Sequence, residues 1–202
     1  MKKITILFEG DSLTANSFEK TDASLGKGYP FISANKVITA FPNIEFVFFN
    51  EAVAGSKTDD VRKRLERELI KYQPDIVSLF IGVNDSRANY TPLFFQENYT
   101  AILKLIKQYE ARLIVVEPYL CPVDIYKRYE ARPTLIEFQE IIRLEMLKYA
   151  DAFIPLDGLF FNAYLSNDPK SYFVDGLHLS PKGHEFIGEI HGEYLIDLVK
   201  NI

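Results

Sequence analysis

The sequence predicts one doubly wound α/β domain over residues 1–202, with a parallel sheet between two layers of helices. Three observations predict this fold. Five short runs are mainly apolar without alternation, segments with helical spacing separate them, and the order strand then helix repeats five times. Parallel strands need crossover connections, and these connections are right-handed in nearly all known sheets. No linker rich in Gly, Pro or Ser interrupts the pattern.

The apolar runs have the composition of strands that are buried on both faces. Such strands show no alternation of polar and apolar residues, because helices cover each side of a parallel sheet. The expected strands are 4–8, 45–49, 76–81 and 112–116, with a weaker fifth at 152–156.

Apolar residues at helical spacing mark the segments between these strands. The stripes cover 61–72, 99–109, 135–149 and 186–198, and a further helix is expected over 29–41. Thr58 is the expected N-cap of the first stripe, and Pro74 ends that helix. Ser180 and Pro181 are the expected N-cap and first residue of the last helix. The charged residues within 62–68 have mixed sign, so we expect them to form a solvent-exposed face.

Composition excludes several classes of function. The 202 residues are 48% hydrophobic and 25% charged, with a formal net charge of -5. A mildly acidic chain without a basic block is not expected to bind nucleic acid or an anionic membrane. The run at 4–8 is shorter than the ~7–15 apolar residues of a secretory signal, and the stretch 76–83 is far below the ~20 of a membrane span. We therefore expect a cytoplasmic protein, with a homo-oligomer left open. The single cysteine, Cys121, is expected to be buried.

Polar residues and glycines follow the expected strands at the points where each strand ends. Ser12 follows the first strand, Gly55 the second and Asn84 the third, while Asp175 and His178 lie between the fifth strand and the last helix. Each alone fits a helix cap, a turn or a surface pair. Because ligands bind at the carboxyl ends of parallel strands, however, these residues are expected to meet at one edge of the sheet.

Together these residues could perform acyl transfer. Ser12 supplies a hydroxyl nucleophile and His178 a base, and Asp175 could orient the imidazole through Nδ1. The N–H groups of Ser12 and Gly55 and the amide of Asn84 could stabilise the oxyanion that develops.

The four blocks resemble those of the SGNH, or GDSL, hydrolases, which are named for the invariant Ser, Gly, Asn and His of four blocks. The resemblance covers residues 10–178, from Gly-Asp-Ser-Leu through Gly55 and Gly-Val-Asn-Asp to Asp-x-x-His. It implies a three-layer, flavodoxin-like α/β/α sandwich with a five-stranded parallel sheet. It also implies Ser12 as nucleophile, His178 as base and Asp175 as the third triad member, with Ser12, Gly55 and Asn84 as oxyanion donors. Many relatives have glycine at the position of Ala52.

The implied function is that of a serine esterase without cofactor, acting on short-chain carboxyl esters or O-acetylated sugars. A thioesterase or lysophospholipase of the same family stays open, as does a noncatalytic flavodoxin-like binding protein. In some relatives a backbone carbonyl orients the histidine, so the role of Asp175 also stays open. No metal site is expected, and His184 and His191 are predicted to have hydrogen-bond partners within the protein.

Substrate contacts are expected from the long connections 84–95 and 118–132, which carry several aromatic residues. The candidate substrate-binding residues are Asp11, Tyr90 and Tyr119. For each aromatic side chain in these connections, closing the core beneath a loop is an equally good explanation. The aromatic residues of the two connections are Tyr90, Phe94, Phe95, Tyr119, Tyr126 and Tyr129.

Overall fold

A computed structural model describes residues 2–15, 25–122 and 128–202 and contains a five-stranded, all-parallel sheet. The strand order is β2-β1-β3-β4-β5, the doubly wound arrangement that the sequence predicts. The strands are β1 (Lys2–Gly10), β2 (Ile44–Asn50), β3 (Ile76–Phe80), β4 (Arg112–Val116) and β5 (Ala152–Ile154).

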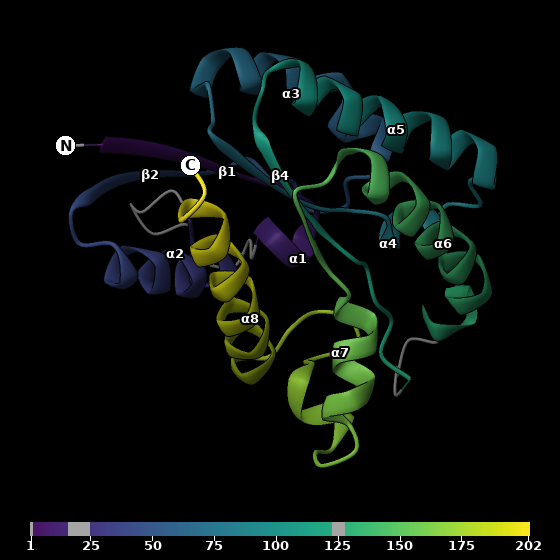
Figure 1. The fold of residues 1–202 in the computed structure, drawn as a ribbon. Helices are drawn as coiled ribbons and strands as arrows, with labels where there is room; N and C mark the ends of the chain where they lie inside the picture. Colours follow the sequence, from purple (N-terminus) through teal and green to yellow (C-terminus); the bar gives the residue numbers. More distant parts are fainter. Residues whose placement is uncertain (1, 16–24, 123–127) are drawn as a thin grey trace.

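Helices cover both faces of this sheet. Figure 1 shows α3 and α5 on one side of it and α2 and α8 on the other. The helices are α1 (Ser12–Ala15), α2 (Tyr29–Ala40), α3 (Thr58–Tyr72), α4 (Val83–Arg87), α5 (Pro92–Gln108), α6 (Arg132–Tyr149), α7 (Leu156–Ala163) and α8 (Pro181–Val199), with 3-10 turns η1 (Arg128–Ala131) and η2 (Pro169–Tyr172).

Successive strand residues belong to two separate cores. In β3, Ile76 and Phe80 pack in the core beneath α2 and α8, while Val77 and Leu79 pack in the core beneath α3, α5 and α6. Side chains alternate between the two faces of a strand, and both faces are covered here. This is the physical reason why the strands are apolar without alternation.

The predicted N-cap of the last helix is confirmed, and the predicted N-cap at Thr58 is not. Ser180 caps α8, since its hydroxyl accepts a hydrogen bond from Gly183 N–H (3.2 Å), and Pro181 is the first residue of the helix. Thr58, in contrast, is the first residue of α3, with Lys57 as N-cap. The Thr58 hydroxyl instead donates to Asp85 Oδ1 (2.6 Å), a partner far away in the sequence. The N-cap prediction for Thr58 is therefore wrong.

Several short helical segments, α4 and α7 among them, lie outside the predicted elements. The connection 84–95 is mostly helical, because α4 lies within it and α5 begins at Pro92. Thr91 caps α5 by accepting a hydrogen bond from Phe94 N–H (3.2 Å), and this Thr-Pro signal is readable in the sequence. Helix α7 follows β5 directly and shortens the predicted fifth strand.

The histidines of α8 have protein partners, as predicted. His191 is fully buried and contacts the hydroxyls of Ser33 (2.8 Å) and Ser78 (2.7 Å). His184 Nδ1 accepts a hydrogen bond from Tyr29 N–H (3.2 Å). Burial lowers the pKa of His184 to about 4 and that of His191 to about 3, so both rings are neutral near pH 7. Cys121 is buried, which confirms the expectation for this residue.

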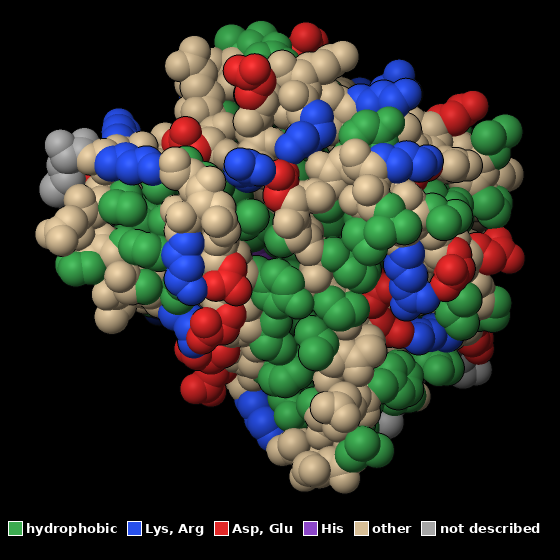
Figure 2. Space-filling view, viewed as in Figure 1, with side chains coloured by type: hydrophobic (Ala, Val, Ile, Leu, Met, Phe, Trp, Pro, Cys, Tyr) green, Lys and Arg blue, Asp and Glu red, His purple; other side chains and the backbone are tan. Residues whose placement is uncertain are grey.

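The outer surface mixes charged and apolar side chains. Figure 2 shows acidic and basic side chains over the outer face of α8, where Lys36 pairs with Glu189 and Glu193. Within the described ranges, no helix is both long and apolar enough to cross a bilayer. The same residues contain no group of three or more His, Cys, Asp or Glu side chains arranged to hold a metal ion.

Candidate active site

The segments that carry the candidate residues follow neighbouring strands. Strand β1 lies between β2 and β3, and Gly10 at its end pairs with Phe80 at the end of β3. The chain leaves β1 into Ser12, β2 into the turn of Gly55, and β3 into Asn84. These three segments therefore meet at the carboxyl edge of the sheet, at the point where the strand order reverses.

A chain of side-chain contacts links the serine, the histidine and the aspartate. Ser12 Oγ lies 3.1 Å from His178 Nε2, and His178 Nδ1 lies 2.8 Å from Asp175 Oδ2. The Ser12 and His178 side chains come from opposite ends of the chain, and both are partly exposed. In this arrangement the imidazole can take the Ser12 proton on Nε2 while Asp175 holds Nδ1–H.

The loop before α8 folds around the Asp175 carboxylate. Asp175 Oδ1 accepts hydrogen bonds from the N–H groups of Leu177 (3.0 Å) and His178 (2.8 Å). Gly176 has a φ of +85°, a conformation that favours glycine. The Val174 N–H donates to the His178 carbonyl (2.8 Å) and closes the loop. The short spacing Asp-x-x-His is thus enough to orient the ring from its own loop.

Hydrogen bonding decides the charge of Asp175. Partial burial acts to raise its pKa, but the bonds from the His178 ring and from the two backbone N–H groups outweigh this effect. The pKa of Asp175 is lowered to about 2, so the carboxylate is ionised at neutral pH.

Asp11 shapes the turn that presents Ser12. Its carbonyl accepts hydrogen bonds from the N–H groups of Thr14 (3.1 Å) and Ala15 (2.9 Å), and its Oδ1 accepts one from Leu13 N–H (2.9 Å). These bonds begin α1 at Ser12. Burial raises the pKa of Asp11 to about 7, and the bond from Leu13 opposes the rise.

Gly55 and Asn84 come from the segments that follow β2 and β3. Gly55 is exposed and has a φ of +81°, which explains glycine at this position. Asn84 Nδ2 donates to the Ser56 carbonyl (3.1 Å) and to Asp11 Oδ2 (3.3 Å). Across residues 2–15, 25–122 and 128–202, no acceptor takes a hydrogen bond from the N–H of Ser12 or Gly55. Ala52 is not among the described residues with positive φ, so alanine fits here without strain.

Comparisons with known proteins identify the family of this chain. A model of the GDSL-like Lipase/Acylhydrolase family matches residues 8–186. The chain belongs to this family. It is 23% identical over 214 residues to an acetylxylan esterase from Geobacillus stearothermophilus, covering 94% of this chain and 95% of that protein. It is 24% identical over 196 residues to an arylesterase from Vibrio mimicus, covering 95% of this chain and 88% of that protein.

Solved structures show the same fold. A protein from Parabacteroides merdae, provisionally assigned as a GDSL-like lipase, superimposes with a TM-score of 0.85 at 24% identity over 95% of each chain. The family and its esterase relatives show that this GDSL-like hydrolase is an ester-hydrolysing enzyme. The alternative of a noncatalytic binding protein is therefore wrong.

Two predicted substrate contacts of this GDSL-like hydrolase are buried instead. Asp11 is 1% exposed, and its carboxylate contacts Leu13 and Asn84. Tyr119 is 1% exposed, and its hydroxyl donates to the Leu177 carbonyl (2.9 Å). Neither side chain has surface to offer a substrate in this structure, so both predictions are corrected: Asp11 supports the turn of Ser12, and Tyr119 supports the loop that carries His178.

Tyr90 also has a partner within the protein. Its hydroxyl donates to Asp59 Oδ1 (2.8 Å) at the start of α3, and its half-buried ring packs edge-on against Phe94. Phe95 is buried, whereas Tyr126 lies outside the described residues.

The prediction of a fully solvent-exposed charged face on α3 is wrong for two residues. The side chain of Arg64 is 13% exposed and that of Glu68 is 4% exposed. Arg64 forms an ion pair with Glu9, a charged residue at the end of β1 that is fully buried. The sequence signal was Glu9 itself, because a carboxylate directly after a buried apolar run needs a partner inside the protein.

Proposed function

We propose that this enzyme is a serine esterase that hydrolyses small acyl esters through an acyl-enzyme on Ser12. The observation that carries the proposal is the continuous chain of contacts Ser12 Oγ–His178 Nε2 (3.1 Å) and His178 Nδ1–Asp175 Oδ2 (2.8 Å). In the Geobacillus stearothermophilus acetylxylan esterase, a serine-to-alanine variant and an aspartate-to-alanine variant are each described as catalytic mutants. Those descriptions support a serine and an aspartate with the same roles here.

In the first step, Ser12 Oγ forms a bond to the carbonyl carbon of the ester and its proton passes to His178 Nε2. The carbonyl oxygen becomes an oxyanion. The N–H groups of Ser12 and Gly55 are free to donate to it, and the amide of Asn84 reaches it by giving up its longer contact, 3.3 Å to Asp11. The ionised Asp175 stabilises the imidazolium that forms.

In the following steps, the carbon–oxygen bond to the alcohol breaks and His178 gives its proton to the leaving alcohol. Water then attacks the acyl-enzyme while His178 Nε2 takes one of its protons. The second tetrahedral intermediate collapses, the proton returns to Ser12 Oγ, and the carboxylic acid leaves. Every proton transfer uses the one nitrogen that contacts Ser12, and no cofactor is needed.

We assign short-chain carboxyl esters or O-acetylated sugars as the substrate class. The support is the name of the acetylxylan esterase relative, which aligns over nearly all of both chains. No contact in the described residues favours a thioester or a lysophospholipid.

The test is labelling with a fluorophosphonate probe, with mass mapping of the adduct, on the wild type and on Ser12→Ala. We expect an adduct on Ser12 that is lost in the variant, and hydrolysis of p-nitrophenyl acetate faster than that of the octanoate. Failure of the folded wild type to react would contradict the nucleophile. A preference for the octanoate would contradict only the assignment of small acyl groups.

A further inference from the structure

Arg64 is an inward-facing arginine on a helix whose other basic side chains face solvent. The exposed fraction of its side chain is 13%, against 79% for Arg67 and 69% for Lys63 on the same helix. A guanidinium is costly to bury without acceptors, and three of the four residues that this one contacts lie next to the candidate active site.

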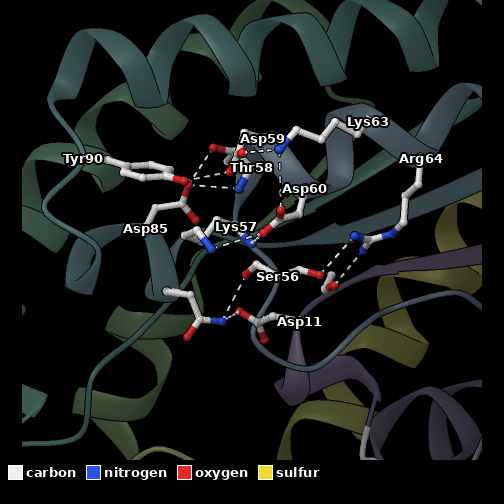
Figure 3. A network of polar contacts seen from close by, with 12 residues as sticks. Asp11, Ser56, Lys57, Thr58, Asp59, Asp60, Lys63, Arg64, Asp85 and Tyr90 are labelled. Atoms are coloured by element: carbon white, nitrogen blue, oxygen red, sulfur yellow. Dashed lines mark hydrogen bonds and ion pairs between the residues drawn. The ribbon is translucent and has the colours of Figure 1, made fainter.

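The two ends of the guanidinium contact different segments. One terminal nitrogen, Nη2, pairs with the Glu9 carboxylate and donates to the Gly10 carbonyl (3.2 Å). The other, Nη1, donates to Ser56 Oγ (3.0 Å). Figure 3 shows the side chains of Arg64 and Ser56 pointing toward one another above the turn of Asp11. The remaining nitrogen, Nε, lies 3.5 Å from a carboxylate oxygen of Glu68.

Both of these segments lead directly to groups proposed as oxyanion donors. Gly10 comes two residues before Ser12, and Ser56 directly follows Gly55. The Ser56 carbonyl in turn accepts the hydrogen bond from the Asn84 amide (3.1 Å). One guanidinium therefore connects the backbone before Ser12 with the turn that carries Gly55 and supports Asn84.

We propose that Arg64 is a positioning residue that sets the spacing between the three donors of the oxyanion hole. The inference rests on the proposed function, because it concerns how the Ser12, Gly55 and Asn84 donors are held. An oxyanion hole works only when its donors are placed before the reaction, and displacements near 1 Å can cost ~10²-fold in rate. The planar guanidinium fork holds two segments at a set separation. A lysine ammonium, a single donor point on a flexible chain, cannot contact both.

The experiment compares Arg64→Lys and Ser56→Ala with a matched control, Arg67→Lys, on the exposed side of α3. The substrate is p-nitrophenyl acetate. The second readout is inhibition by a trifluoromethyl ketone, to whose carbonyl carbon Ser12 Oγ adds. That addition sends the Ser12 proton to His178 and places an alkoxide among the oxyanion donors.

We expect Arg64→Lys to lower kcat by about 10- to 100-fold with KM changed less than about threefold. We expect the trifluoromethyl ketone to bind more weakly by a factor similar to the loss of kcat/KM, because both report on the same oxyanion. Ser56→Ala should show a smaller loss of the same kind. The double variant should lose less than the product of the two single effects, because both substitutions break one contact.

A purely structural role predicts a different result. In that case Arg64→Lys lowers the melting temperature while kcat and ketone binding at 25 °C match those of Arg67→Lys, and the proposal is overturned. If Arg64→Lys does not fold, Ser56→Ala decides alone, since it removes one hydroxyl and keeps the ion pair with Glu9. A wild type that neither turns over ester nor forms the ketone adduct refutes the proposed function itself, which is a separate outcome.

Discussion

Two carboxylates of the candidate active site have opposite pKa shifts because their surroundings differ. Asp175 is partly buried, which acts to raise its pKa, but three hydrogen-bond donors favour the ionised form and lower the pKa to about 2. Asp11 is buried with fewer donors, and its pKa rises to about 7. At the scale of single residues, Asp175 is therefore suited to hold a positively charged imidazole, and Asp11 to organise the turn of Ser12.

Asp175→Asn tests how much the carboxylate contributes. We expect kcat/KM for p-nitrophenyl acetate to fall by up to ~10⁴, because asparagine can present an N–H to His178 and favour the wrong tautomer. Asp197→Asn on the exposed end of α8 is the matched control, since the Asp197 side chain is 74% exposed. A loss below about tenfold would mean that Ser12 and His178 act as a dyad.

Asp175→Asn should also change how the stability of the fold depends on pH. The pKa of Asp175 is lower in the folded chain than its usual value of 3.8, so the carboxylate stabilises the fold above about pH 4. This contribution is lost as the pH falls from about 4 to about 2. The difference in urea midpoint between wild type and Asp175→Asn should narrow over that range, and a constant difference would contradict the pKa shift.

At the scale of the elements, one contact fixes the start of α3 against α4. The Thr58 hydroxyl (2.6 Å) and Thr58 N–H (2.9 Å) both donate to Asp85 Oδ1. Burial raises the pKa of Asp85 to about 6, and the two bonds from Thr58 oppose the rise. Asp85 directly follows Asn84 and Thr58 lies three residues after Gly55, so this contact joins the elements that carry two proposed oxyanion donors.

Thr58→Val keeps the shape of the side chain but removes the hydroxyl donor. We expect it to lower the free energy of unfolding by about 1–3 kcal/mol, because the buried Asp85 carboxylate loses a hydrogen bond. Thr58→Ser, which keeps the hydroxyl, is the control and should be much closer to wild type. Urea unfolding at pH 8 measures both, and a Thr58→Val variant as stable as the wild type would contradict the role of the hydrogen bond.

At the scale of the whole molecule, buried polar side chains link the layers of the sandwich. His191 on α8 contacts Ser33 on α2 and Ser78 on β3, and its ring also packs against Phe8 of β1 (5.4 Å between centroids). Because the ring is fully buried and its pKa is about 3, the folded chain holds it neutral across the physiological range.

This histidine makes the fold sensitive to acid. The unfolded chain takes up a proton at His191 near pH 6.5, whereas the folded chain does so only near pH 3. Stability should therefore fall as the pH drops below about 6.5, by up to about 1.4 kcal/mol per pH unit for each such group. His184, with a pKa of about 4, adds to the same trend.

His191→Gln removes the titrating group and keeps polar atoms near the two serines. We expect a lower free energy of unfolding at pH 8, measured by urea unfolding followed by circular dichroism. Between pH 6 and pH 4 this free energy should fall less steeply than in the wild type, because about one proton fewer is taken up on unfolding. An unchanged slope would mean that His191 is not the buried neutral ring described above.

Much of the site could be predicted because it depends on local signals and on topology. The residues Ser12, Gly55 and Asn84 follow three strands that neighbour one another, so the carboxyl ends of β2, β1 and β3 bring them to one edge. The pair Asp175 and His178 is held within a single loop. The sequence displays that these residues follow apolar runs, and the structure supplies the order of the strands in the sheet.

Which polar side chains point inward was decided by the tertiary structure. Arg64 and Arg67 have the same type and lie on the same helix, yet only Arg64 faces the buried carboxylate of Glu9. Tyr119 can donate to the Leu177 carbonyl because the loop before α8 passes close to the segment that follows β4. Helical spacing predicts which residues form the apolar face of a helix. It does not predict which side chains of other elements will contact a residue at the edge of that face.

The sequence by itself therefore determined the positions of the strands along the chain, the fold class and the five residues of the proposed chemistry. It could do so because strands buried on both faces and the motifs at strand ends are encoded in short segments. The packing of distant elements alone decided the roles of Arg64, Thr58 and Tyr119, since each depends on a partner far away in the chain. Long-range contacts of this kind have no local sequence pattern.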